Sequence, residues 1–134
     1  MPKRTTKTPD GTHQTLKNMS YENGLISWLM YDGWQVFAPV LDNGHKTDIL
    51  ISDGPNYYRI QVKTIDAHGE DQVLDNKWED SNVDFVIYIA RNSTWGYVMP
   101  AFVESKRPMN HASHKRFLHQ DRKSFLKAFH LVEA

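Results

Sequence analysis

Residues 47–63 read TDILISDGPNYYRIQVK, two β-rich runs joined by a turn. The first run, residues 48–51, is apolar with β-branched side chains, and the second, residues 57–63, alternates polar and apolar side chains. Both patterns are typical of β-strands, and the Asp-Gly-Pro-Asn sequence between them has the residue types that form turns. The stretch therefore predicts a β-hairpin that places one face against a core.

Polar side chains gather at one end of this hairpin. Gln61 and Lys63 are two residues apart on the second strand, so their side chains share one face, roughly 6–7 Å apart. Asp48 opens the neighbouring strand, which brings a carboxylate, an amide and an ammonium group to the same end of the sheet. A solvated strand face with an aspartate that caps a turn has the same spacing, so the spacing alone leaves both interpretations open.

Such a mixture of groups suits phosphodiester hydrolysis. A divalent cation prefers oxygen ligands, which Asp48, the amide of Gln61 and the carbonyl of Val62 can supply. The cation lowers the pKa of a bound water and neutralises charge on the phosphate. Lys63 can orient or deprotonate the attacking water, or hold a phosphate oxygen. Glu22, among apolar residues of the preceding segment, can add a water-mediated ligand.

The rest of the chain supplies further elements around the hairpin. We expect helices at residues 13–32 and 112–130, and additional strands at residues 34–40, 84–90 and 95–99. Gly33 stands where a helix-terminating glycine belongs, residues 42–46 form a polar turn, and residues 73–78 can hold a short helix. This order predicts an α/β (α+β) fold in which a mixed central β-sheet is flanked by helices.

The charge of the chain is balanced in total and uneven along its length. The 134 residues include 16 Lys and Arg and 16 Asp and Glu. Both ends are basic, whereas residues 66–84 hold seven acids and one base, Lys77. The basic ends suggest a surface for a polyanion, although ordinary solvated surfaces have the same composition. We expect a flexible basic arm over residues 1–12 and a single domain over residues 13–134.

Several classes of function are excluded by composition. The sequence has no cysteine, which excludes a disulfide scaffold, a thiolate metal site and a cysteine nucleophile. No apolar run is long enough to span a bilayer or to act as a signal peptide, so we expect a cytoplasmic protein without membrane contact. Phosphate-binding glycine motifs are absent, which argues against a nucleotide cofactor. A metal site at His111, His114 and His119 is less favoured than surface positions or DNA contacts for these residues.

The hairpin and its surroundings resemble the PD-(D/E)XK nuclease superfamily, in which a first helix carries Glu and a hairpin carries Asp and (D/E)xK. The matching segments are Tyr-Glu-Asn-Gly-Leu-Ile-Ser-Trp-Leu around Glu22, Lys-Thr-Asp-Ile-Leu-Ile around Asp48, and Gln-Val-Lys-Thr from Gln61. The most similar subgroup is the group I intron-associated homing endonucleases, which share Ile-Gln-Val-Lys-Thr, a Val-Asp-Phe strand and a Tyr-x-x-Pro strand. Archaeal-type Holliday junction resolvases are the second resemblance. The match covers about residues 19–101.

This resemblance implies a restriction-endonuclease-like core and a catalytic set of Glu22, Asp48, Gln61 and Lys63. It also implies Mg²⁺, with Mn²⁺ as a substitute, held by Asp48, Gln61, Val62 and Glu22. The sequence departs from the family motif at Gln61, which replaces an acid and removes one negative ligand. The intron-associated subgroup also has glutamine at this position.

Together these features predict a metal-dependent DNA endonuclease of the homing type, specific for a sequence. A structure-selective Holliday junction resolvase is one alternative, and a nuclease-fold module that binds nucleic acid without cutting is another. Cutting two strands needs two sites, so we expect a dimer or a tetramer. The expected DNA contacts are Lys3, Arg4, Lys7, His45, Lys46, Lys115, Arg116, Arg122 and Lys123.

Overall fold

The computed structural model describes residues 1–41 and 44–133. Within them, a long helix comes first and a short helix last, with eight strands between. The elements are α1 (Asp10–Tyr31), β1 (Gln35–Phe37), β2 (Ile49–Ser52), β3 (Tyr57–Ile65), β4 (Val73–Asp75), β5 (Phe85–Ala90), β6 (Trp95–Pro100), β7 (Lys106–Pro108), β8 (Lys115–Leu118) and α2 (Arg122–Leu131). Asp42 and Asn43 of the expected turn, and Ala134 of the expected domain, lie outside the described residues.

Six of the strands form one mixed sheet in the order β1-β2-β3-β5-β6-β8. Neighbouring strands are antiparallel except β3 and β5, which are parallel. The expected hairpin is formed by β2 and β3, with Ile49 opposite Ile60 and Ser52 opposite Tyr57. β4 and β7 make a separate two-stranded sheet. The expected α+β fold with a mixed central sheet is therefore confirmed.

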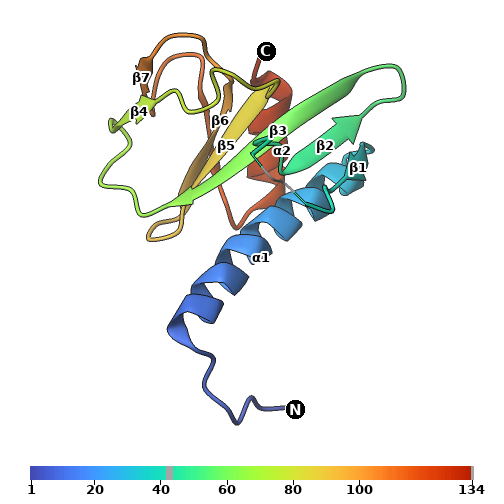
Figure 1. Ribbon diagram of the computed structural model, residues 1–134, viewed down its shortest axis with the longest axis vertical. Helices are drawn as coiled ribbons and strands as arrows, with labels where there is room; N and C mark the ends of the chain where they lie inside the picture. The colour runs from blue at the N-terminus through green and yellow to red at the C-terminus, as the bar shows by residue number, and fades with distance from the viewer. Residues whose placement is uncertain (42–43, 134) are drawn as a thin grey trace.

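Both helices cover one face of the six-stranded sheet (Figure 1). On that face, Leu25 and Leu29 of α1 and Phe125 of α2 pack with alternate strand residues, including Ile60 and Ile87. The other face of β5 and β6 is covered by a second cluster, which includes Leu74, Trp78, Phe102 and Met109. Because both faces are covered, every residue of β5 is buried, which explains its unbroken apolar sequence. No helix in the described ranges is long and apolar enough to cross a bilayer.

Helix α1 ends at a glycine, as expected. Gly33 has a φ of 103°, in the left-handed region, and its N–H donates to the carbonyl of Met30 at 3.0 Å. The N–H of Trp34 donates to the carbonyl of Leu29 at 3.1 Å. This pair of hydrogen bonds is the Schellman motif, which turns the chain directly from α1 into β1. At the other end, the first turns of α1 extend away from the sheet (Figure 1).

The expected helix over residues 112–130 is wrong in its first half. Residues 115–118 form β8, which pairs with β6, and α2 begins only at Arg122. Phe117 lies opposite Gly96, where a Cβ atom would come within 2.6 Å of the Phe117 ring, so the missing side chain makes room for the aromatic ring. A short helix over residues 73–78 is also wrong, because residues 73–75 form β4 against β7.

Candidate functional site

The central sheet opens into a fork beside the hairpin. β2 pairs with β3 only as far as Ile60, whereas β3 continues to Ile65 with β5 on its other edge. Asp48 lies where the strands separate, and its N–H donates to the carbonyl of Ile60 at 2.9 Å. Its carboxylate Oδ2 accepts from the backbone N–H of Val62 at 2.7 Å. This bond to the next strand holds the carboxylate at the open edge of β3.

Gln61 lies next to this carboxylate in the fork. Its neighbours Ile60 and Val62 pack toward the helices, so the alternation of the strand directs Gln61 to the opposite face. The Oε1 atom of Gln61 is buried and has no hydrogen-bond partner among the described residues. Leaving a buried acceptor without a donor costs about 1–3 kcal/mol, so this oxygen is suited to a ligand that accepts electron pairs.

The oxygen atoms of the fork fit a hard divalent cation. They comprise the Asp48 carboxylate, the orphan amide oxygen of Gln61 and the carbonyl of Val62, which lies on the same strand edge as the Val62 N–H. Residues 1–41 and 44–133 contain no group of three or more His, Asp or Glu side chains that could hold a metal. The candidate ligands named here are one carboxylate and two neutral oxygens.

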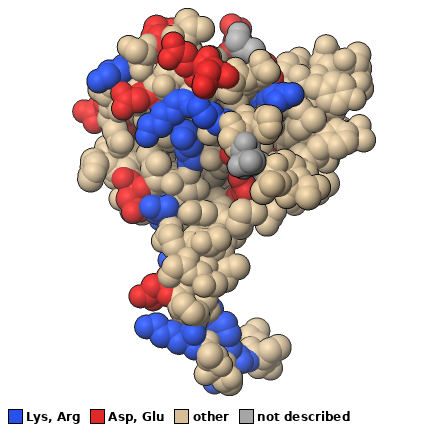
Figure 2. All heavy atoms as spheres, in the orientation of Figure 1, with Lys and Arg blue, Asp and Glu red and all other residues tan. Residues whose placement is uncertain are grey.

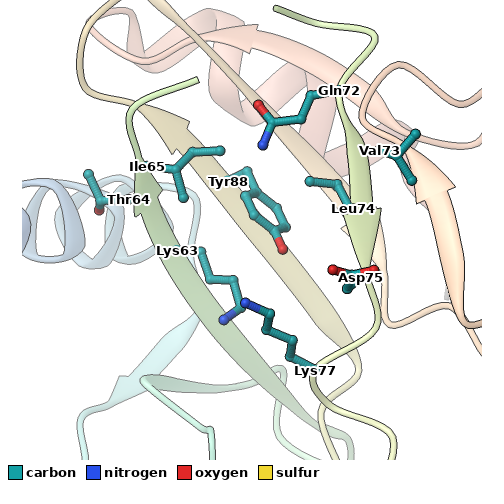
Figure 3. A pocket seen from close by; sticks show the side chains of 9 residues that line it. All are labelled: Lys63, Thr64, Ile65, Gln72, Val73, Leu74, Asp75, Lys77 and Tyr88. Atoms are coloured by element: carbon teal, nitrogen blue, oxygen red, sulfur yellow. The ribbon is translucent and has the colours of Figure 1, made fainter. Parts of the chain in front are cut away.

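Lys63 extends from the same strand face into a cavity of about 290 Å³ (Figure 3). The other lining residues come from β3, β5 and the β4 segment: Thr64, Ile65, Gln72, Val73, Leu74, Asp75, Lys77 and Tyr88. Burial lowers the pKa of Lys63, and the positive charge of Lys77 lowers it further, against the opposing effect of Asp48. The negative charge of Asp48 therefore does not fully offset the effects of burial and of Lys77 on the Lys63 ammonium.

Tyr88 lies between the two strands that border this cavity, and its hydroxyl points into it (Figure 3). The side chain is 4% exposed. Burial, with a contribution from Asp75, raises the pKa of Tyr88 to about 12. The phenol therefore stays protonated at neutral pH and offers a hydrogen-bond donor.

Glu22, the fourth member of the expected catalytic set, lies in the middle of α1. It is partly buried, three residues before the core residue Leu25. Helix α1 packs on the sheet beside β3. The structure thus places Asp48, Gln61 and Lys63 at one fork. The catalytic role of these three residues and of Glu22 stays a prediction.

The residues expected to contact DNA fall into two groups. Lys3, Arg4 and Lys7 are exposed in the projecting N-terminal segment, where Figure 2 shows a cluster of basic side chains. The others lie on the body of the molecule, and several have partners within the protein. Lys46 pairs with Asp80 at 3.2 Å, Arg116 pairs with Glu70 at 2.6 Å, and the Arg122 guanidinium lies 3.8 Å from the centre of the Tyr31 ring. His45 and Lys123 are exposed, and Lys115 is half-buried. The role of all nine as DNA contacts stays a prediction.

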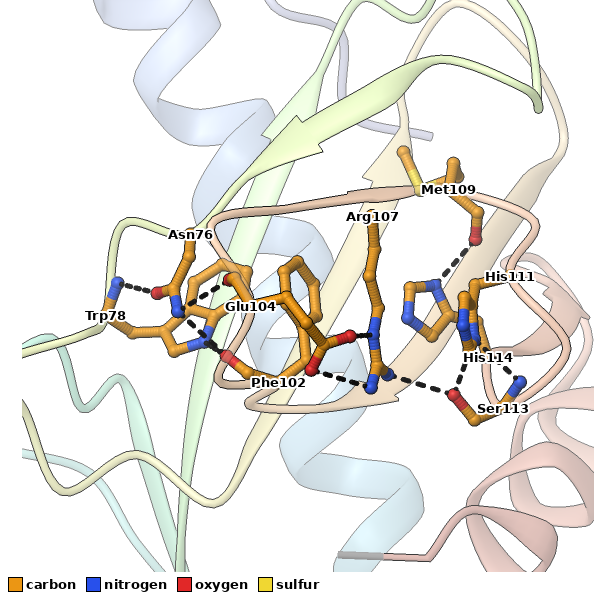
Figure 4. Close-up of polar contacts among 9 residues, drawn as sticks. All are labelled: Asn76, Trp78, Phe102, Glu104, Arg107, Met109, His111, Ser113 and His114. Atoms are coloured by element: carbon orange, nitrogen blue, oxygen red, sulfur yellow. Dashed lines mark hydrogen bonds and ion pairs between the residues drawn. The ribbon is translucent and has the colours of Figure 1, made fainter.

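His111, His114 and His119, the histidines considered as a metal site, make hydrogen bonds within loops. His111 Nδ1 accepts from the backbone N–H of Ser113 at 3.1 Å, and His114 Nδ1 donates to the carbonyl of Met109 at 2.8 Å (Figure 4). His119 Nε2 donates to two backbone carbonyls, at 2.7 and 3.1 Å. The His119 contacts join distant chain segments, whereas those of His111 and His114 are local. Within the described residues these histidines form no metal site.

Sequence reasoning missed the residues that complete the cavity around Lys63. Gln72, Lys77 and Tyr88 lie outside the hairpin, and only the folded topology brings them beside it. One signal was available, because Lys77 is the single base in the acidic stretch of residues 66–84.

Comparisons with known proteins support the fold. No family model matches this chain, and no curated protein matches it by sequence. Among solved structures, a bacterial homing endonuclease, I-Ssp6803I, is similar over 87% of this chain and 88% of its own, with a TM-score of 0.55 and 22% sequence identity. The Holliday junction resolvase Hjc of Archaeoglobus fulgidus matches over 67% of this chain and 80% of its own, with a TM-score of 0.46 and 16% identity. The similarity to the first of these structures confirms the expected restriction-endonuclease-like fold.

Proposed function

We propose that the protein is a metal-dependent DNA endonuclease that hydrolyses phosphodiester bonds. The fork of the sheet carries this proposal: Asp48 is fixed by the Val62 N–H, a buried oxygen of Gln61 has no partner among the described residues, and Lys63 extends from the same face. These groups stand on a fold that the chain shares with a solved homing endonuclease. A carboxylate, an amide and a lysine on rigid strands form a preorganised polar site.

Each residue of the fork has a distinct task in this mechanism. Asp48, Gln61 and the Val62 carbonyl would hold a divalent cation, which supplies Lewis-acid activation of water and neutralises charge on the phosphate. Glu22 is the proposed fourth, water-mediated ligand. Lys63 holds a phosphate oxygen or orients the attacking water, and its poorly compensated charge favours an anionic partner.

The proposal is tested by cleavage assays with supercoiled plasmid, linear duplex and a synthetic four-way junction, each with Mg²⁺ or with EDTA. We expect cutting with Mg²⁺ only. Asp48→Asn keeps an acceptor for the Val62 N–H but removes the negative charge, and Lys63→Gln removes the ammonium. Each variant should lose activity by about 10²-fold or more while still binding DNA in EDTA.

Two control variants remove the same charges elsewhere. The controls are Asp71→Asn and Lys127→Gln. Asp71 lies in an exposed turn, and Lys127 is an exposed residue of α2, which packs on the other face of the sheet. Both should cut at the rate of the unmodified protein. Undiminished cleavage by Asp48→Asn or Lys63→Gln would refute the site.

The same assay separates the finer alternatives. Cleavage at rare sites in duplex DNA supports the homing type. The Gln61-Val62-Lys63 sequence of the hairpin favours this type, because the similar homing endonucleases also have glutamine at the first position. Cleavage of the four-way junction alone supports a resolvase, and binding without cleavage supports a non-cutting module. Because each chain carries one fork, paired cuts require a second copy, and we propose a dimer or tetramer on DNA.

A further inference from the structure

Lys63 and Lys77 share one cavity although they are 14 residues apart in the sequence. Lys63 comes from β3, and Lys77 comes from the segment that follows β4. Figure 3 shows both side chains directed toward the same space. Within residues 1–41 and 44–133, neither ammonium group makes an ion pair. Two like charges held near each other repel, and an anion between them would remove that repulsion.

Two uncharged polar side chains that line this cavity, Gln72 and Tyr88, can donate hydrogen bonds. The Gln72 Oε1 atom already accepts from the backbone N–H of His68 at 3.3 Å, which leaves its amide NH₂ directed into the cavity (Figure 3). The Tyr88 hydroxyl is protonated at neutral pH and points to the same place. Donors from two further elements therefore surround the two ammonium groups.

The cavity has one acid, Asp75, and this acid has a partner outside it. Its carboxylate lies 3.8 Å from the ammonium of Lys106 on β7. Asp75 therefore shares its charge with Lys106. Asp48, the acid whose charge acts on Lys63, is held at the fork by the Val62 N–H. A volume of about 290 Å³ with two cations and two neutral donors is suited to a tetrahedral oxyanion.

We propose that Lys63 and Lys77 together hold one phosphodiester group of the nucleic-acid backbone in this cavity, with Gln72 and Tyr88 donating to it. This assigns Lys77 as a binding residue on a different segment from the hairpin. The inference rests on the proposed function for the choice of nucleic acid as ligand. The proposal makes residues 72–77, which include β4, part of the substrate site. Lys77 is the one base within the acidic stretch of residues 66–84.

The test uses thymidine 3′,5′-bisphosphate, added to the full chain in EDTA. This probe presents the 3′- and 5′-phosphates of one nucleotide as monoesters, without a target sequence. Binding is followed by NMR of the lysine side-chain CH₂ groups next to nitrogen. The signals of Lys63 and Lys77 should shift together. Lys77→Gln should weaken binding about tenfold or more, because one charge-assisted contact is lost, whereas Lys77→Arg should retain most of it.

Lys127→Gln is the matched control, since it removes one exposed positive charge on the far face of the sheet and should bind as the unmodified protein does. Circular dichroism melting checks that each variant is folded. Unchanged affinity in folded Lys77→Gln, or no shift of the Lys77 signal, would overturn the inference. Because no cleavage takes place in EDTA, loss of this binding site and loss of endonuclease activity are scored separately.

Discussion

At the scale of single residues, His114 shows how burial fixes a charge state. The side chain is 6% exposed, its Nδ1 donates to the Met109 carbonyl, and its Nε2 is buried without a partner among the described residues. Its ring stacks on Phe102, with 5.8 Å between the centroids. Burial lowers the pKa of His114 to about 4. The folded protein therefore keeps this imidazole neutral where an unfolded chain would protonate it.

This difference predicts a pH-dependent stability. Between pH 6.5 and pH 4 the unfolded state binds a proton at His114 and the folded state does not, so stability falls as the pH decreases through that window. At pH 5.0 the loss from this residue should be about 2 kcal/mol relative to pH 7.5. His114→Gln, which keeps a donor but cannot titrate, should lose less free energy of unfolding in urea over this interval. Exposed His13→Gln should behave like the unmodified protein, and an equal pH dependence in His114→Gln would contradict the argument.

At the scale of elements, the end of α1 depends on the backbone of Gly33. Its φ of 103° is strained for any residue with a Cβ atom, although nothing lies within 4 Å of the position a Cβ would take. Gly33→Ala should therefore lower the free energy of unfolding by about 1–2 kcal/mol through backbone strain alone.

Gly24 provides the opposite control on the same helix. It lies in the interior of α1 and also has open space around it, so Gly24→Ala should raise stability by up to about 1 kcal/mol. Urea denaturation of the two variants measures the difference. If both changes had the same sign, the left-handed conformation at Gly33 would not explain the helix end.

The elements predicted from sequence were those with strong local signals. The β2–β3 hairpin has alternation and a turn, and α1 has apolar spacing and a terminal glycine. The prediction of one helix over residues 112–130 was wrong because the spacing of Phe117 and Phe125 also fits a single helix. Asp121 indicates where the helix begins, because its carboxylate accepts from the N–H groups of Lys123 and Ser124 and caps the N-terminus of α2. Space opposite Gly96, which no local pattern reveals, then fixes β8 in the sheet.

Only the part of the candidate site that belongs to one hairpin could be predicted from the sequence. Asp48, Gln61 and Lys63 are placed by one hairpin, so strand alternation was enough to bring them together. Lys77 is placed by the β4–β7 pairing, which joins segments about 30 residues apart and has no periodic signal in the sequence. Long-range pairing of this kind follows from the packing of a second layer on the sheet.

At the scale of the whole molecule, a net charge of zero hides an uneven distribution. Several acids of residues 66–84 are neutralised within the fold, where Asp66 pairs with Arg91 and Glu70 with Arg116. The N-terminal segment has no such compensation in the described structure, and its bases stand apart from the body (Figure 2). The surface offered to a polyanion is therefore more basic at this end than the total charge indicates.

Removal of residues 1–7 should weaken DNA binding through electrostatics alone. The segment contains Lys3, Arg4 and Lys7, and all seven residues are exposed, so the fold loses no packing. Each phosphate contact adds about 0.9 to the slope of log affinity against log salt, so three lost contacts should reduce that slope by up to about 3. Fluorescence anisotropy of a labelled duplex in EDTA, over a range of salt concentrations, measures the change.

A full-length chain with Gln at these three positions should show the same reduction, because charge and not chain length is responsible. A slope that is equal in the truncated and full-length proteins would show that the DNA lies elsewhere, on the body around the fork.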